Sequence, residues 1–277
     1  MSQINVDIVQ PSSGTTVTVN GAQVKGGPIR STKVGDNIQS VPSADSILVG
    51  SNIFNGPMAG SGYLPQVVAI GSLMGQSSWF SVSTSVFIGA EAAKSLNNCS
   101  GSVFIGNQSG MLASNSDNNT FIGDNSGSNL TGGQNNTAIG YNAKPATATT
   151  NHSITLGNSS ITSLRCAVTS ITSLSDARDK KEVEDLNVGL EFIDGLRPVK
   201  FVWNDRNKDG KHDIADFGFI AQELKAAEDA VEMADVLKLV YDENPDKLEA
   251  SYGKLLPIMV KAIQELSAEL KALKAEK

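Results

Sequence analysis

The chain has 277 residues and a formal net charge of −7, which is enough length for two or three structural units. Residues 1–174 carry six basic and six acidic residues, so the whole net charge falls after Leu174. The sequence has no basic patch, no apolar run that could cross a bilayer and no His/Cys cluster, so we expect no nucleic-acid partner, no membrane insertion and no zinc site.

Residues 1–45 form an N-terminal module with little apolar mass. Residues 15–19 alternate and end at Asn20-Gly21, a strong hairpin signal. The first residues lack the basic and apolar stretches of a secretory signal, so we expect none. Two interpretations remain open: a mobile arm, or a β-rich attachment module that docks on another protein.

Residues 46–160 repeat a short apolar run that ends in glycine, such as VFIG, TFIG and TAIG. The last five of these glycines are each 17 residues apart, and they are Gly89, Gly106, Gly123, Gly140 and Gly157. A fixed period of this length indicates stacked supersecondary units. The sequence therefore predicts a mostly β shaft of β-roll or β-solenoid repeats.

One such repeat cannot bury its own apolar face, and no long helix in residues 46–160 could cover it. We expect three chains around one axis, with Phe and Ile inside and Asn, Ser and Thr outside. A monomeric solenoid is the alternative. The shaft has too few acidic residues for the paired carboxylates of a glycosidase, so we do not expect a depolymerase.

Residues 161–174 form a β-branched connector, and residues 175–277 form a densely charged α+β domain. Apolar spacing predicts a helix over 183–193, strands at 199–203 and 217–220, a helix over 222–233, and strands at 239–241 and 248–252. The final helix begins near Lys254 and carries a coiled-coil seam at Met259, Ile263, Leu266, Leu270 and Leu273.

The boundary between these regions reads SDARDKKEV, and it is followed by LRPVKFVW, FGFIAQEL and ENPDKLEASYGKLLPIMVKAIQEL. In this order the motifs resemble the C-terminal intramolecular chaperone of phage tail spikes and fibres, the self-cleaving domain of the endosialidase type. The repeats are similar to the trimeric β-rolls of phage fibres and of trimeric autotransporter adhesins. The resemblance implies a homotrimer and cleavage between Leu174 and Ser175.

In the terms of that family, Ser175 is the nucleophile, Lys180 is its base, and Asp176 and Arg178 support the loop. Lysine in water has a pKa of about 10.4, so a basic amine requires burial in the assembled trimer. Backbone N–H groups at the start of the next helix could stabilise the oxyanion. The reaction would occur once per chain, and it needs no cofactor.

A polar loop between the two predicted strands at 199–203 and 217–220 matches most positions of a calcium loop. Its candidate ligands are Asp205, Asn207, Asp209, Asp213 and Asp216. No helix clearly precedes the loop, and Asp replaces the bidentate Glu at its last position. An ordinary hydrophilic hairpin is the alternative.

The resemblance implies a trimeric tail fibre or spike that is assembled in the host cytoplasm and carried on the virion tail. Its N-terminus would dock on tail or baseplate proteins, and its shaft would contact a glycan or protein receptor on the host surface. Two alternatives remain. The chaperone could stay attached as a permanent tip, or the chain could be a cellular trimeric adhesin, which the absence of a signal and an anchor disfavours.

Overall fold

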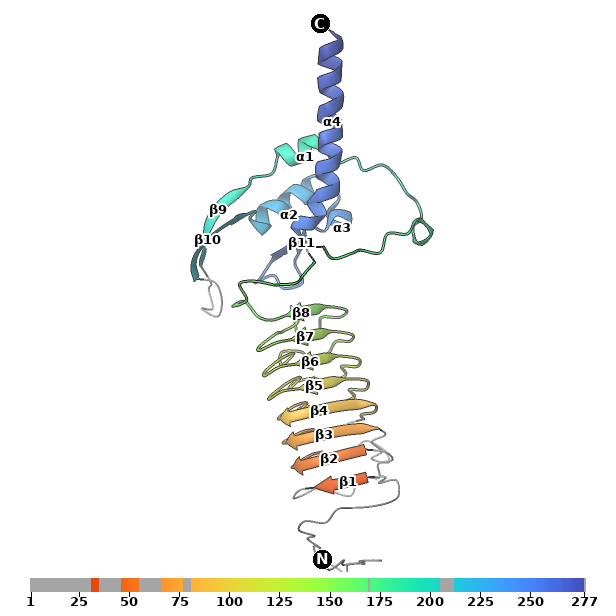
Figure 1. The fold of residues 1–277 in the computed structure, drawn as a ribbon, viewed down its shortest axis with the longest axis vertical. Helices are drawn as coiled ribbons and strands as arrows, with labels where there is room; N and C mark the ends of the chain where they lie inside the picture. The colour runs from red at the N-terminus through yellow and green to blue at the C-terminus, as the bar shows by residue number, and fades with distance from the viewer. Residues whose placement is uncertain are drawn as a thin grey trace, which may run out of the picture.

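The structure is a computed structural model that describes residues 31–34, 46–54, 66–76, 81–168, 170–204 and 212–276. It consists of a solenoid of parallel strands, the shaft, followed by a small α+β region that ends in a long helix (Figure 1). The helix stands at the end of the shaft farthest from the N-terminus. The hairpin predicted at residues 15–21 lies outside the described residues.

The shaft is one parallel sheet in which each strand pairs with the next strand in the chain. Its strands are β1 (Ser31–Val34), β2 (Ser46–Ser51), β3 (Val67–Ser72), β4 (Ser85–Ala90), β5 (Val103–Ile105), β6 (Thr120–Ile122), β7 (Thr137–Ile139) and β8 (Ile154–Leu156). Phe104 pairs with Phe87 on one side and with Phe121 on the other. This register confirms the predicted β-solenoid and its 17-residue period.

The interior of the shaft is a ladder of phenylalanine rings within a single chain. Phe87, Phe104 and Phe121 are fully buried. The rings of Phe104 and Phe121 are stacked, with centroids 5.1 Å apart. Our expectation that the phenylalanines pack between chains was wrong, because each coil closes around its own ring and neighbouring coils cover the two faces of that ring.

The isoleucines that follow these phenylalanines point to the outside of the coil, because successive strand residues face opposite sides. They form a column of apolar side chains along the outer sheet face, in the order Val49, Ile70, Ile88, Ile105, Ile122, Ile139 and Leu156. Strands β2 to β8 contain no charged residue. We call this column the outer apolar column.

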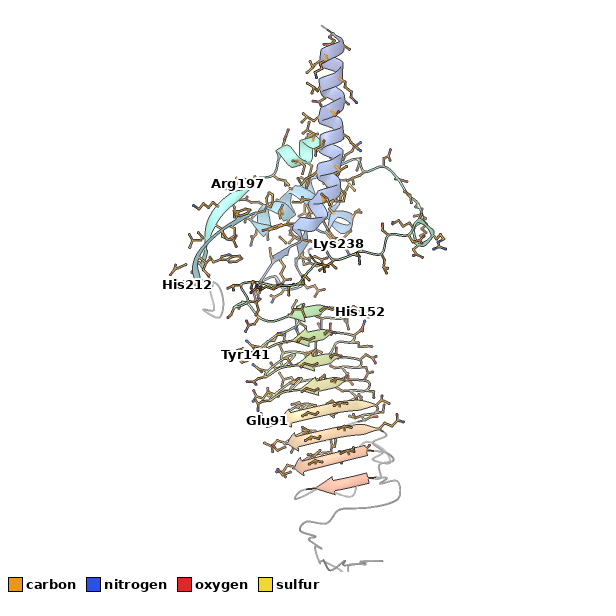
Figure 2. All side chains as sticks on the ribbon, in the orientation of Figure 1. Glu91, Tyr141, His152, Arg197, His212 and Lys238 are labelled. Atoms are coloured by element: carbon orange, nitrogen blue, oxygen red, sulfur yellow. The ribbon has the colours of Figure 1, made fainter. Side chains whose placement is uncertain are left out.

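Close stacking of the coils requires glycine at the end of each strand. A Cβ atom on Gly123, whose φ is +132°, would lie 2.5 Å from the carbonyl oxygen of Gly140 in the next coil. At the edges of the shaft, asparagines take left-handed backbone conformations at turns. Glu91 and Tyr141 lie at one edge and His152 at the other (Figure 2).

A buried polar ladder, which we call the Ser/Asn ladder, precedes the strands. Each of its side chains accepts a hydrogen bond from the backbone N–H of the equivalent residue one coil later, as Asn119 Oδ1 does from Asn136 N at 2.9 Å. Its members are Ser85, Ser102, Asn119 and Asn136. The ladder satisfies polar groups that would otherwise be unpaired inside the coil.

The α+β region begins with the 3-10 helix η1 (Ala177–Asp179) and α1 (Leu190–Asp194). The antiparallel strands β9 (Val199–Asn204) and β10 (His212–Gly218) follow, and then α2 (Ala221–Ala230) and α3 (Ala234–Leu237). The pair β11 (Val240–Tyr241) and β12 (Glu249–Ala250) leads to the 3-10 helix η2 (Tyr252–Lys254) and to α4 (Leu255–Ala275).

The helix predicted over 183–193 is much shorter than expected, because only Leu190–Asp194 is helical. Gly189 is the N-cap of α1, and it has no side chain to cap the helix. Glu265 of α4 supplies the cap instead, since its Oε2 accepts a hydrogen bond from Leu190 N at 2.7 Å. This partner is 75 residues away, so local spacing could not have set the boundary.

The core of the α+β region lies where α1, α3 and the base of α4 meet. It contains Val188, Phe192, Leu237, Leu239, Leu255 and Ile258. Farther along α4, the predicted seam residues are about half exposed, from 47% at Met259 to 64% at Ile263. No helix among the described residues is long and apolar enough to span a membrane.

Candidate functional site

Leu174 and Ser175 lie on a long segment that leaves the shaft after β8, swings away from the molecule and returns at α1 (Figure 1). From Ile161 to Leu186 this segment has no helix or strand apart from η1 among the described residues. The side chain of Leu174 is 99% exposed. The predicted scissile bond is therefore presented to solvent in an irregular, accessible chain.

A tight turn after Ser175 is organised by Asp176. Its Oδ1 accepts a hydrogen bond from the backbone N–H of Arg178 at 2.8 Å, which makes Asp176 the N-cap of η1. The guanidinium of Arg178 also bonds both carboxylate oxygens, at 3.0 Å from Nε and 2.7 Å from a terminal nitrogen. The hydrogen bonds from Arg178 hold the pKa of Asp176 below its ordinary value, and Asp176 raises the pKa of Arg178.

This turn brings Lys180 back onto Ser175. Lys180 Nζ lies 2.7 Å from Ser175 Oγ and 2.7 Å from the carbonyl oxygen of Ser175. The turn closes through hydrogen bonds from Asp179 N to Asp176 O and from Lys180 N to Ala177 O, both 3.2 Å long. The structure thus brings together the four residues of the predicted site, with the amine within proton-transfer distance of the hydroxyl.

The surroundings of this Ser–Lys pair bear on two parts of the expected mechanism. Both side chains are exposed in the single chain, so the burial that the mechanism requires is not present within one chain. The backbone N–H of Arg178 bonds Asp176, and the next helix, α1, begins only at Leu190. The predicted oxyanion donors at a helix start therefore do not come from α1 in this chain.

The candidate calcium loop is only partly described. Asp205, Asn207 and Asp209 lie outside the described residues, whereas Asp213 and Asp216 lie on β10. Asp216 accepts hydrogen bonds from Trp203 Nε1 at 3.0 Å and from Phe217 N at 2.9 Å. Asp213 Oδ2 lies 3.4 Å from His212 Nε2. Within the described residues, no group of three or more His, Cys, Asp or Glu side chains could hold a metal ion.

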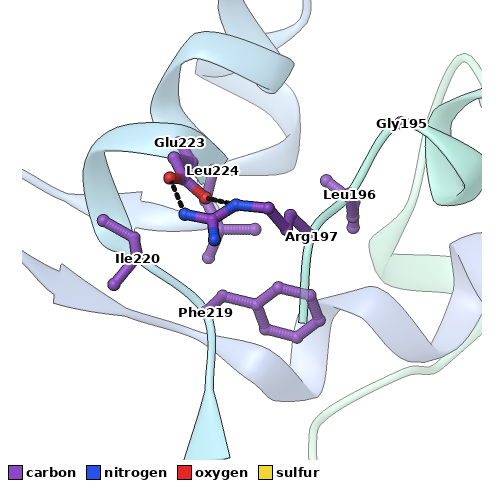
Figure 3. Close-up of a pocket in the computed structure, with 7 residues that line it drawn as sticks. All are labelled: Gly195, Leu196, Arg197, Phe219, Ile220, Glu223 and Leu224. Carbon is purple, nitrogen blue, oxygen red and sulfur yellow. Dashed lines mark hydrogen bonds and ion pairs between the residues drawn. The ribbon is translucent and has the colours of Figure 1, made fainter. Parts of the chain in front are cut away.

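A cavity of about 280 Å³ lies between α2 and the chain that leads into β9 (Figure 3). Leu196, Phe219, Ile220 and Leu224 supply its apolar walls. The guanidinium of Arg197 lies against the carboxylate of Glu223 at its rim, in a two-point ion pair. This ion pair raises the pKa of Arg197, and it ties the chain just before β9 to α2. The carboxylate of Glu223 is engaged by Arg197, so we regard this cavity as part of the scaffold.

Sequence reasoning missed the contact between the last coil of the shaft and the α+β region. Thr150 Oγ1 donates a hydrogen bond to Glu243 Oε2 at 3.3 Å, and Asn244 Nδ2 donates one to Ala146 O at 3.2 Å. The sequence indicated only a turn at Asn244-Pro245-Asp246. The available signal was the change of the last repeat to a threonine-rich loop, PATATT.

Residues 175–236 match the family model described as chaperone of endosialidase. The match begins at Ser175 itself, and it includes Asp176, Arg178 and Lys180. No curated protein and no solved structure showed a significant match to the chain. The chain therefore carries an endosialidase-type chaperone domain after a β-solenoid shaft.

Proposed function

We propose, from the premise that an endosialidase-type chaperone domain follows the shaft, that this chain is a trimeric bacteriophage tail fibre or spike protein. Its chaperone domain assembles three chains and then cuts itself off before Ser175. The mature shaft serves host attachment through a surface glycan or protein. Its N-terminal module docks on other tail or baseplate proteins after assembly in the host cytoplasm.

The observation that carries the trimer is the outer apolar column. Ile122 is 37% exposed, Ile139 42% and Leu156 53%, and these side chains follow one another along the sheet. A continuous apolar face without charge is unusual on a monomeric protein, and it is typical of an interface. A second copy of the same face is a suitable partner, because the column is uncharged and has the same strand spacing in each copy.

The exposed seam of α4 supports the same arrangement. Met259, Ile263, Leu266, Leu270 and Leu273 follow one stripe of the helix in steps of four and three residues. Such a stripe packs against copies of itself in a parallel coiled coil. Because α4 continues along the long axis of the shaft (Figure 1), a coil of three helices would hold three shafts side by side in register.

Cleavage follows from the position of Ser175 relative to its own peptide bond. Ser175 Oγ attacks the carbonyl carbon of Leu174, the C–N bond breaks, and an ester forms while the amino group of Ser175 leaves. Water then hydrolyses the ester, which gives the carboxylate of Leu174 and restores the hydroxyl. Lys180 takes the proton of the hydroxyl and delivers it to the departing amine. The attack is intramolecular, so effective molarity supplies much of the rate.

Assembly is the switch in this proposal. A lysine amine in water keeps its proton near neutral pH and cannot act as a base. The Ser–Lys pair is exposed in the single chain, so its burial must come from neighbouring chains in the trimer. Cleavage before assembly would release the chaperone too early, and the exposed setting of the pair prevents this.

Retention of the chaperone as a permanent tip is the second candidate. The contact between Glu243 and Thr150 favours it, because that contact holds the domain on the shaft independently of the peptide bond. The two candidates differ in the mass of the mature chain.

The test is the intact mass of the purified chain and of three variants. The wild-type chain should give fragments that end at Leu174 and begin at Ser175. Ser175→Ala and Lys180→Ala should remain full length and still assemble, because neither residue lies in the shaft or in the seam. Lys180→Arg should also remain intact, since a guanidinium does not act as a base at this pH. Cleavage of Ser175→Ala at the wild-type rate would contradict the mechanism.

A further inference from the structure

The C-terminal end of the shaft is polar where earlier coils are apolar. Leu96, Ala113 and Leu130 occupy equivalent positions in three successive coils, and all three are fully buried. The next equivalent position is Thr147, whose hydroxyl lies 2.9 Å from the hydroxyl of Thr150. An apolar side chain at this position would be suited to packing against another coil, whereas the hydroxyl of a threonine is suited to hydrogen bonding with a polar partner.

The hydrogen bonds inside the coil also end at this place. Each side chain of the Ser/Asn ladder donates a hydrogen bond to a carbonyl 14 residues farther along the chain, and the last of these runs from Asn136 Nδ2 to Thr150 O at 2.7 Å. The next equivalent side chain, Ser153, turns back and donates to Asn136 Oδ1 at 2.9 Å. The carbonyl of Thr150 is therefore the last one that accepts a hydrogen bond from a ladder side chain 14 residues earlier.

The chaperone domain contacts the shaft at this residue. Glu243 accepts a hydrogen bond from Thr150 Oγ1 across 93 residues of sequence, and Asn244 bonds the carbonyl of Ala146 in the same loop of the last coil. Both belong to the connection between β11 and β12, which we call the cap loop (residues 242–248). Figure 1 shows β11 beyond β8 along the long axis, on the side of the shaft that carries the α+β region.

The cap loop is held in shape by its own contacts. Asp242 forms an ion pair with Lys225 of α2 at 2.6 Å. Asn244 Oδ1 accepts a hydrogen bond from Asp246 N at 3.1 Å, and Lys247 N bonds Asn244 O at 3.0 Å. Because the loop is tied to α2 at one end and folded on itself, it can present Glu243 and Asn244 before the shaft has formed.

We infer that the cap loop is the template on which the last coil of the shaft folds, and that it fixes the register of the solenoid. Solenoids need capped ends, and nearly identical repeats could otherwise stack one coil out of place. The loop at residues 146–150 differs from the corresponding loops of earlier coils, so only the last coil offers the threonine pair. The inference rests on the proposed chaperone role, and it identifies the cap loop as the surface through which the chaperone domain acts on the shaft.

The test uses full-length chains with Ser175→Ala, so that the domain stays attached. Glu243→Ala combined with Asn244→Asp removes both contacts but keeps an oxygen that accepts from Asp246 N, and Glu249→Ala on β12 is the control, since it removes an exposed carboxylate of the same domain. Amide hydrogen exchange over residues 140–157 should become roughly threefold faster without the contacts, because opening of the last coil is limited by such bonds. Refolding of the shaft from denaturant should slow by a similar factor, and exchange in α4 should not change.

A change on the shaft side makes the test independent of the chaperone fold. Thr150→Val keeps the shape of the side chain and removes the hydroxyl together with its hydrogen bonds to Thr147 and Glu243, so it should accelerate exchange in the last coil by itself. Adding Glu243→Ala to Thr150→Val should then have little further effect. If the acceleration of exchange in the double variant equals the product of the two single accelerations, a direct contact between Thr150 and Glu243 is contradicted.

The outcomes separate this inference from the proposed function. Equal exchange and equal refolding in the cap-loop variant and the Glu249→Ala control would overturn the template, even if both chains are trimeric. A monomeric chain in which the cap-loop variant still exchanges faster would support the template and contradict the trimer.

Discussion

Phe104→Ala tests whether the shaft is held together within each chain. The ring of Phe104 is fully buried, stacks on Phe121 at 5.1 Å and lies 5.4 Å from Phe87. Truncation of a buried phenylalanine to alanine destabilises a protein by about 3–5 kcal/mol. A native domain is stable by only about 5–15 kcal/mol, so most of the local stability of the shaft should be lost.

The assay is chemical denaturation of full-length Ser175→Ala chains, followed by circular dichroism at several protomer concentrations. Phe217→Ala is the control, because Phe217 is 82% exposed on β10. Phe104→Ala should lower the transition at every concentration, since the lost contacts lie inside the coil. Ile122→Asn on the outer apolar column should instead weaken assembly, and its effect should fade as the concentration rises. A loss for Phe104→Ala no larger than that for Phe217→Ala would refute an interior within the single chain.

Three further predictions concern single residues and the calcium loop. Gly123→Ala should destabilise the shaft by at least about 1–3 kcal/mol, because its backbone is left-handed and the new Cβ meets the next coil; an unchanged melting temperature would contradict this. Burial raises the pKa of the Cys99 thiol from 9.0 to about 12, because the folded chain favours the neutral thiol. The contribution of this thiol to the free energy of unfolding should therefore be complete below pH 9 and should be lost as the pH rises towards 12. Cys99→Ala should remove that part of the pH dependence, and a thiol reagent at pH 8 should label only Cys166 in the folded chain; labelling of Cys99 at the same rate would contradict its burial. Calcium binding by the loop from Asp205 to Asp216 remains a prediction, and a calcium titration should show a saturable site and a raised melting temperature. No change at millimolar calcium would contradict the prediction and favour an ordinary hairpin.

The repeat period could be predicted because it depends on local sequence, and the proximity of Ser175 and Lys180 likewise depends on residues close together in the chain. A strand followed by glycine every 17 residues determines the coil, since only glycine permits the close approach at Gly123. The turn at Asp176 depends on a side chain that bonds the backbone two residues later, and it brings Lys180 onto Ser175 without any distant partner. Their role as a catalytic pair came from the family resemblance, because a serine and a lysine five residues apart are weak evidence by themselves, and that role remains a prediction.

The features that were not predicted depend on partners far away in the sequence. Alternation in VFIG shows that Phe and Ile face opposite sides, but it does not show which side lies inside one chain. The N-terminus of α1 is capped by Glu265, and the last coil of the shaft contacts Glu243. Neither contact can be read from the local pattern of charged and apolar residues.

The mass of the native assembly tests the central claim most directly. Native mass spectrometry of the freshly purified wild-type chain should show three copies of the fragment that ends at Leu174, together with the released domain that begins at Ser175. The Ser175→Ala chain should appear as three full-length copies. A wild-type chain that is monomeric and intact at micromolar concentration would contradict both the assembly and the self-cleavage proposed for this protein.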